Sequence, residues 1–215
     1  IDAGNATIAG GVQTGPLAEF DLNGGDDTLA VDGVSYTFPL GGATAFVGDN
    51  TDGSLLFTTA CVYGGPSNTL DDCGNVTAGI TGGGVSIGAA YDFDNGFTAA
   101  AGAQFDETGI ATKGKDDSFA VNAAYTGDNY GVSVTYAMIE DSSGATNDDD
   151  TFYAFNGYYS FDNGLNISAG YEVGDVGANA DTADESINYF LGVNGEVGPG
   201  ELGAAIGTSG GQLEN

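Results

Sequence analysis

Bulky apolar residues occupy every second position through much of the chain, with small residues between them. The clearest run lies at residues 130–138, where the bulky positions are Tyr130, Val132, Val134, Tyr136 and Met138 and the small ones are Gly131, Ser133, Thr135 and Ala137. A period of two is typical of a β-strand with two different faces, whereas a helix repeats every three to four residues. No segment shows the helical period. We therefore predict an all-β chain.

The same alternation predicts about ten strands in hairpin order. An imperfect strand at residues 29–38 precedes a turn at 39–42 and a short strand through Phe46 and Val47. Clean strands follow at residues 85–93, 97–105, 119–125, 130–138, 153–161, 165–173, 187–193 and 202–206. Tight turns at residues 94–96, 127–129 and 162–164 alternate with longer acidic loops at 106–118, 140–150 and 174–186, and a turn at residues 195–200 joins the last hairpin. Short connections at one end and long ones at the other are typical of an antiparallel up-and-down barrel of the outer-membrane type.

Aromatic residues gather beside the tight turns. They are Tyr91, Phe93, Phe97, Tyr125, Tyr130, Tyr159 and Phe161. Aromatic girdles of this kind mark the lipid–water interfaces of a transmembrane β-barrel. The alternative is a soluble β-sandwich whose bulky face is the core, since alternation alone fits both. The small face favours the membrane barrel, because it carries Gly, Ala, Ser, Asn and Thr with almost no charge, as suits a wet lumen.

The charge of the chain is strongly negative. It has 31 Asp and Glu against 2 Lys and Arg, a formal net charge of −29, and the acids crowd the predicted loops. Phosphate recognition depends on Lys and Arg, so nucleic acid is excluded as a partner. Cations are the expected binding partners, including Ca²⁺ or other divalent cations that bridge the acidic loops to lipopolysaccharide.

Enzymatic chemistry finds little support. The chain has no His, so no Ser–His or Cys–His pair exists, and no phosphate-binding loop of the Gly-Lys-Ser/Thr type occurs. A zinc site would need four ligands, which Cys61 and Cys73 cannot supply without His. A disulfide between these two cysteines, in an oxidising compartment, is favoured over two free thiols. We expect no enzyme activity and no cofactor.

Three stretches carry a family resemblance: residues 57–74 (FTTACVYGGPSNTLDDCG), 91–96 (YDFDNG) and 123–134 (AAYTGDNYGVSV). They resemble the porins of marine cyanobacterial outer membranes, a family that includes carbohydrate-selective and iron-uptake types. The resemblance implies a barrel that passes small hydrophilic solutes and inorganic ions, and porins are often trimeric. In that family a surface-layer-homology region tethers the barrel to peptidoglycan. No such region is present here, so we expect residues 1–215 to be a single domain, the interior portion of a barrel of about sixteen strands.

Residues 48–84 form the longest predicted connection and contain both cysteines. In porins one long loop commonly folds into the lumen and sets the constriction. On that reading Asp49, Asp52, Asp71 and Asp72 would present negative charge to permeating solutes and favour cations. The alternative is an exposed surface loop.

The resulting hypothesis is an outer-membrane channel for passive diffusion. The runner-up is a secreted or surface-layer acidic β-rich filament, stabilised by calcium, in which bulky faces pack sheet on sheet. A single Gly-Asp segment at residues 23–29 echoes calcium-binding repeats, but such repeats work in stacks.

Overall fold

The structure is a computed structural model that describes residues 33–63, 73–80, 84–107, 109–110, 117–140, 149–176, 185–208 and 211–213. The strands among these residues form one antiparallel sheet. Its strands are β1 (Val34–Leu40), β2 (Ala43–Asp49), β3 (Val85–Asp92), β4 (Phe97–Phe105), β5 (Ser118–Thr126), β6 (Tyr130–Ile139), β7 (Asp150–Ser160), β8 (Leu165–Asp175), β9 (Glu185–Val197), β10 (Gly200–Gly207) and β11 (Gly211–Leu213).

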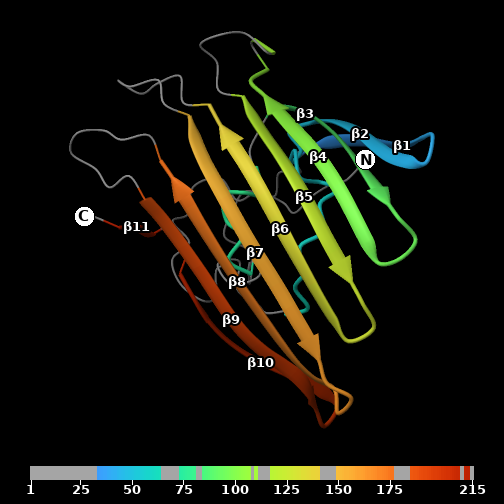
Figure 1. Cartoon of the computed structure of the whole chain (residues 1–215), viewed down its shortest axis with the longest axis vertical. Helices are drawn as coiled ribbons and strands as arrows, with labels where there is room; N and C mark the ends of the chain where they lie inside the picture. Colours follow the sequence, from blue (N-terminus) through green and yellow to red (C-terminus); the bar gives the residue numbers. More distant parts are fainter. Residues whose placement is uncertain are drawn as a thin grey trace, which may run out of the picture.

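Each strand lies beside its neighbour in sequence, so the sheet runs up and down from β1 to β10 without a crossover (Figure 1). The short β11 pairs with β9 along the same edge as β10, but its register is shifted by one residue: Gly207 faces Phe190 and Gly211 faces Ile187. This confirms the predicted all-β, up-and-down antiparallel architecture. Among the described residues, no helix is long and apolar enough to span a membrane.

Tight turns close the hairpins at one end of the sheet, and the longer connections lie at the other (Figure 1). Two of the tight turns contain Asn-Gly, and their glycines have positive φ angles, 86° at Gly96 and 84° at Gly164. The preceding asparagine side chains accept hydrogen bonds from the next strand: Asn95 from the Phe97 amide at 3.2 Å and Asn163 from the Leu165 amide at 3.1 Å. The predicted turn chemistry is therefore confirmed at both positions.

Two predicted turns are shorter than expected. The predicted turn at residues 39–42 reduces to Gly41 and Gly42, because β1 continues to Leu40 and Pro39 pairs with Thr44. Proline is tolerated there because β1 is an edge strand of the described sheet, where a residue without a backbone N–H group can be accommodated. The turn predicted at 195–200 reduces to residues 198–199, because β9 extends to Val197. The predicted start of the first strand, at residues 29–32, lies outside the described residues.

The core lies on the small-residue face of the sheet, opposite to where a sandwich would place it. The main buried cluster packs residues of the long connection, Ala78 and Ile80, against small-face residues of three strands: Ala120, Ala137, Phe152 and Ala154. The soluble sandwich, with the bulky face as core, is therefore wrong for this chain. We call the two sides the small face and the bulky face below.

Aromatic residues on the small face lie over glycines of the adjacent strand. Phe46 faces Gly88, Phe152 faces Gly174, and Tyr158 faces Gly131 in direct register. A Cβ atom at any of these three glycines would collide with the facing ring. The glycines thus make room for the few large side chains that interrupt the small face.

Candidate functional site

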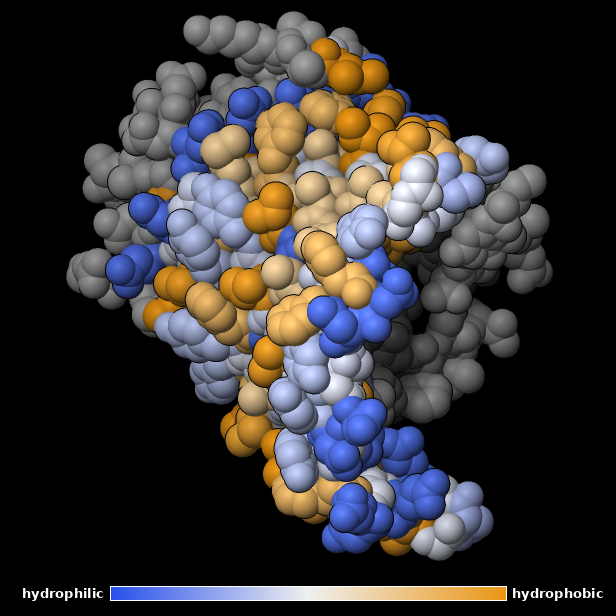
Figure 2. Space-filling view, turned by 45° about the vertical axis from the view of Figure 1, so that its right-hand side comes forward, coloured by the Kyte–Doolittle hydropathy of each residue, from blue (hydrophilic) through white to orange (hydrophobic). Residues whose placement is uncertain are grey.

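The bulky face is exposed along the whole sheet. Val132, Phe155 and Leu191 are 52%, 51% and 52% exposed, although they occupy central strands. Figure 2 shows apolar side chains spread over the sheet in this way, with hydrophilic residues gathered at its lower end. A continuous apolar face of this extent is unfavourable in water and marks a surface that meets lipid or another protein.

The predicted aromatic residues beside the tight turns lie in contact with one another. Four ring pairs link them: Tyr91 with Phe93 (4.8 Å between centroids), Phe97 with Tyr125 (4.7 Å), Tyr125 with Tyr130 (5.5 Å) and Tyr159 with Phe161 (4.7 Å). Tyr130 and Tyr159 are register partners, which joins the Tyr159–Phe161 pair to the chain of Phe97, Tyr125 and Tyr130 rings. We call this set the turn-side belt.

A second aromatic set lies at the opposite end of the strands and was not recognised from the sequence. It consists of the contacting pairs Phe105 with Phe119 (5.8 Å) and Tyr136 with Tyr153 (4.9 Å). We call it the loop-side belt. In β5, β6 and β7 the two belts are six residues apart, at Phe119 and Tyr125, Tyr130 and Tyr136, and Tyr153 and Tyr159. Six residues span about 20 Å along a strand. The signal in the sequence is this repeated spacing.

The described parts of the long connection between β2 and β3, residues 50–63 and 73–80, lie over the small face, and Figure 1 shows them behind the sheet. Alternate residues of its first arm, residues 50–63, donate backbone hydrogen bonds to polar side chains of three strands: the Thr58 amide to Asn122 Oδ1 on β5 (3.0 Å), the Ala60 amide to Ser133 Oγ on β6 (2.8 Å) and the Val62 amide to Ser168 Oγ on β8 (3.1 Å). The connection thus crosses the strands, on the face opposite the belts.

These contacts lie midway between the two belts. Asn122 is three residues from Phe119 and three from Tyr125, and Ser133 has the same position between Tyr130 and Tyr136. Asn156 occupies the matching position on β7, and its Nδ2 donates to the Cys73 carbonyl at 2.7 Å. The connection therefore touches the sheet at half the height of the band that the belts enclose.

The backbone of the connection rests directly on two glycines of the sheet. A Cβ atom at Gly102 on β4 would overlap the Gly53 carbonyl oxygen, and one at Gly170 on β8 would overlap the Cys73 carbonyl oxygen. Such close approach of two backbones requires glycine.

The predicted disulfide between Cys61 and Cys73 is formed, with the two Cα atoms 6.4 Å apart. Cys73 is fully buried and packs with Tyr63 against Phe190 of β9, and the Tyr63 and Phe190 rings meet edge to face at 5.3 Å. The disulfide thus lies against the small face and fixes the two arms of the connection to each other.

Glu172 is a second feature that sequence reasoning missed. It lies on the small face of β8 with no exposed surface, and its carboxylate accepts hydrogen bonds from the Thr77 and Ala78 amides at 2.8 Å each and from Asn188 Nδ2 at 2.8 Å. The available signal was a single carboxylate at a small-face position of the predicted strand at residues 165–173, which carries no other charge.

The four acidic residues expected at a constriction are not brought together among the described residues. Asp49 is the last residue of β2 and shares a face with its register partners Val34 and Val85, which is the bulky face. Asp52 follows in the connection and is exposed. Asp71 and Asp72 lie outside the described residues. So do residues 111–116, 141–148 and 177–184, which make up most of the acidic loops expected to bind divalent cations.

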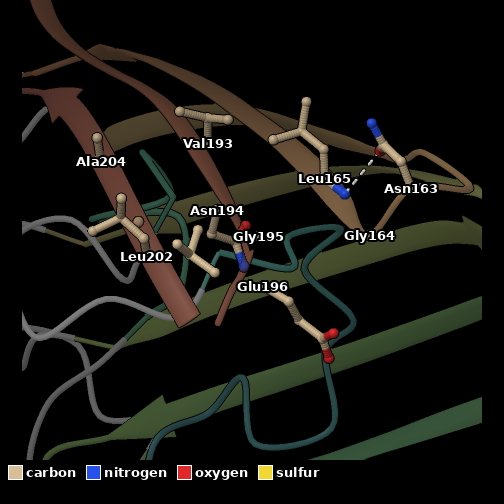
Figure 3. A pocket seen from close by; sticks show the side chains of 11 residues that line it. Asn163, Gly164, Leu165, Val193, Asn194, Gly195, Glu196, Leu202 and Ala204 are labelled. Carbon is tan, nitrogen blue, oxygen red and sulfur yellow. Dashed lines mark hydrogen bonds between the residues drawn. The ribbon is translucent and has the colours of Figure 1, made fainter. Parts of the chain in front are cut away.

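A hollow of about 380 Å³ lies near the tight turns of β8, β9 and β10. Gly195 lines it between two leucines, because Leu165 and Leu202 are its register partners on either side. Figure 3 shows Glu196 directed away from Leu165 and Val193. The leucines that flank the hollow belong to the bulky face, whereas Asn194 and Glu196, which also line it, belong to the small face.

No protein-family model and no curated protein sequence matches this chain. Among solved structures, the chain is similar to a porin refined at 1.8 Å resolution, with a TM-score of 0.51 and 18% sequence identity. The similarity covers 86% of this chain and 60% of the porin, so the chain spans less than two thirds of that porin's length. The likeness shows that the fold is a porin-like β-barrel fold.

Proposed function

We propose that this chain forms part of an outer-membrane channel through which small hydrophilic solutes and inorganic ions diffuse passively. The observation that carries the proposal is the inverted distribution of side chains. Large apolar residues are exposed, as Phe155 is at 51%, whereas polar residues such as Thr135 and Ser168 are fully buried beneath the connection. Lipid outside and a polar lumen inside explain both faces of one sheet.

The two aromatic belts support the membrane orientation. They are separated by a band in which the bulky face carries residues such as Val121, Val132, Val134 and Phe155. Tyr and Phe rings suit the headgroup region at each interface, and the apolar band between them suits hydrocarbon.

We further propose that the connection at residues 50–84 is the constriction of this channel. Its contacts with the sheet midway between the belts, at Asn122, Ser133 and Asn156, support a position at mid-height of the proposed lumen. A segment at that height narrows the permeation path where the barrel wall is surrounded by hydrocarbon. Its side chains would therefore have the strongest influence on passing ions.

Preference for cations is the finer part of the proposal. Asp52, Asp71 and Asp72 belong to the connection, and the chain has only 2 basic residues to oppose them. Rings or clusters of carboxylates at a narrow point attract cations and repel anions. Asp49 is not included among the selectivity residues, because it lies on the bulky face of β2.

Planar-bilayer recording tests the channel and its selectivity together. The purified protein in detergent is expected to produce discrete conductance steps and to run faster unheated than boiled on a denaturing gel. The D52N/D71N/D72N variant is expected to lower the cation-over-anion permeability ratio, while Asp128→Asn, in a tight turn at the other end, leaves it unchanged. Folded protein without conductance would contradict the channel. Protein that sediments without detergent and dissolves on chelation would support the filament instead.

A further inference from the structure

The carboxylate of Glu172 bridges the long connection and the wall of the barrel. Oε2 accepts from the Thr77 and Ala78 amides, both at 2.8 Å, and Oε1 accepts from Thr77 at 3.1 Å and from Asn188 Nδ2 at 2.8 Å. Thr77 and Glu172 are 95 positions apart in sequence. One side chain of β8 therefore joins the second arm of the connection, residues 73–80, to both β8 and β9.

The energetics of this contact depend on the match between donors and acceptor. A buried carboxylate is costly unless its oxygens are hydrogen-bonded, and here both oxygens are. The Thr77 and Ala78 amides are consecutive, and the Ile80 amide donates to the Thr77 carbonyl at 3.0 Å, which closes a turn around them. Consecutive backbone N–H groups in a turn form a cradle for an anion. The connection supplies the cradle and the wall supplies the anion.

The other contacts between connection and wall are of a different kind. The first arm is attached through neutral groups, including Asn122, Ser133 and Ser168, and the second arm through the neutral amide of Asn156 on Cys73. Hydrogen bonds to an ionised carboxylate are roughly twice as strong as neutral ones. Among these described contacts, the Glu172 group is therefore the strongest attachment of the second arm.

We propose that Glu172 is the positioning residue of the constriction: it holds residues 73–80 against the barrel wall and thereby sets the width of the permeation path. This inference rests on the proposed channel function. Glu172 has no exposed surface, so it acts through the arm and not by contacting permeating ions. When the arm is released from the wall, the space available to it is the lumen, so release narrows the path intermittently.

The test compares Glu172→Gln with Glu185→Gln. Gln keeps the shape of Glu but replaces one acceptor oxygen with a donor NH₂ that cannot receive the Thr77 and Ala78 amides. Glu185 provides the matched control, because it is the exposed first residue of β9 and the substitution removes the same charge. Heat-modified mobility on a gel first establishes that each variant is folded.

Two measurements then decide. Hydrogen exchange at the Thr77 and Ala78 amides is expected to be about tenfold faster or more in E172Q than in wild type, with the β8 and β9 amides unchanged. Single-channel recordings of E172Q are expected to show frequent transient closures and a lower mean conductance, while E185Q behaves as wild type. Folded E172Q with wild-type exchange at these amides, or with wild-type current despite faster exchange, would overturn the proposal.

The outcomes separate this inference from the channel proposal. If wild-type protein gives no conductance, the channel itself fails, whatever Glu172 does. If wild type conducts and E172Q is indistinguishable from it, only the role of Glu172 fails. Should E172Q not fold, Glu172→Asp takes its place, because the shorter side chain keeps the charge but cannot reach both arm amides, and the same two outcomes apply.

Discussion

Gly170 of β8 lies directly beneath the carbonyl group of Cys73, so close that a Cβ atom at position 170 would overlap that oxygen. The disulfide end of the connection therefore rests on the bare backbone of the wall. Asn156 holds the same carbonyl from the neighbouring strand, at 2.7 Å. The position of Cys73 is thus fixed both by a hydrogen bond and by the absence of a side chain beneath it.

Gly170→Ala is expected to push the connection away from the wall and to destabilise the fold by about 1–3 kcal/mol, as overpacking does in a tight core. Urea unfolding followed by gel mobility measures the loss. Gly157→Ala is the matched control on the adjacent strand, because a Cβ there meets its nearest neighbour at 3.4 Å, an ordinary contact. Equal stability of the two variants would mean that Cys73 does not rest on Gly170.

Two phenylalanines of β7 provide a test of which face is the core. Phe152, on the small face, is 4% exposed, and Phe155, on the bulky face, is 51% exposed. Phe152→Ala is expected to lose about 3–5 kcal/mol, since it leaves a cavity against Ala78 and Ile80. Phe155→Ala is expected to lose less than about 1 kcal/mol, because surrounding lipid fills the space. The opposite ranking, measured by urea unfolding in lipid vesicles, would restore the sandwich.

Alternation and turn residues were sufficient to predict most of the architecture. The strand at Tyr130–Ile139 follows directly from its period of two, and the Asn95-Gly96 turn from the need for a positive φ angle. Both signals are local, so they are visible in a single stretch of sequence. The predicted turn at residues 39–42 was two residues too long, because proline is permitted at the end of a strand and β1 continues to Leu40.

The arrangement of the connection could not be predicted in the same way. Glu172 meets Thr77 across 95 positions, and no local pattern indicates that pairing. The aromatic residues of the small face, such as Phe152 and Phe190, also interrupt the run of small residues, and the glycine that makes room for Phe152, Gly174, lies on another strand. Asp49 was assigned to the constriction by its neighbourhood in sequence, although alternation along β2 places it on the bulky face. Strand parity would have excluded it.

The disulfide is expected to stabilise the folded chain appreciably. Cys61 and Cys73 are separated by 12 positions, and closing a ring of about this size contributes roughly 3 kcal/mol by restricting the unfolded chain. The C61S/C73S variant should therefore unfold at a lower urea concentration, with a free energy of unfolding reduced by about 2–3 kcal/mol. Wild type treated with a reductant should match the variant, which separates loss of the bond from changes in packing at the serines. An unchanged midpoint would show that the wall contacts alone order the connection.

The strongest test of the membrane orientation places one charge at two equally exposed positions. Val134 and Phe161 are 38% and 41% exposed, but Val134 lies between the belts and Phe161 belongs to the turn-side belt. In a bilayer, Val134→Arg is expected to cost about 2–4 kcal/mol and Phe161→Arg about 0–1 kcal/mol, because the cost of a charge depends on its depth. A protein surrounded by water would show little difference between the two. Unfolding in vesicles of defined lipid provides the measurement, and equal costs at the two positions would mean that the bulky face does not meet hydrocarbon.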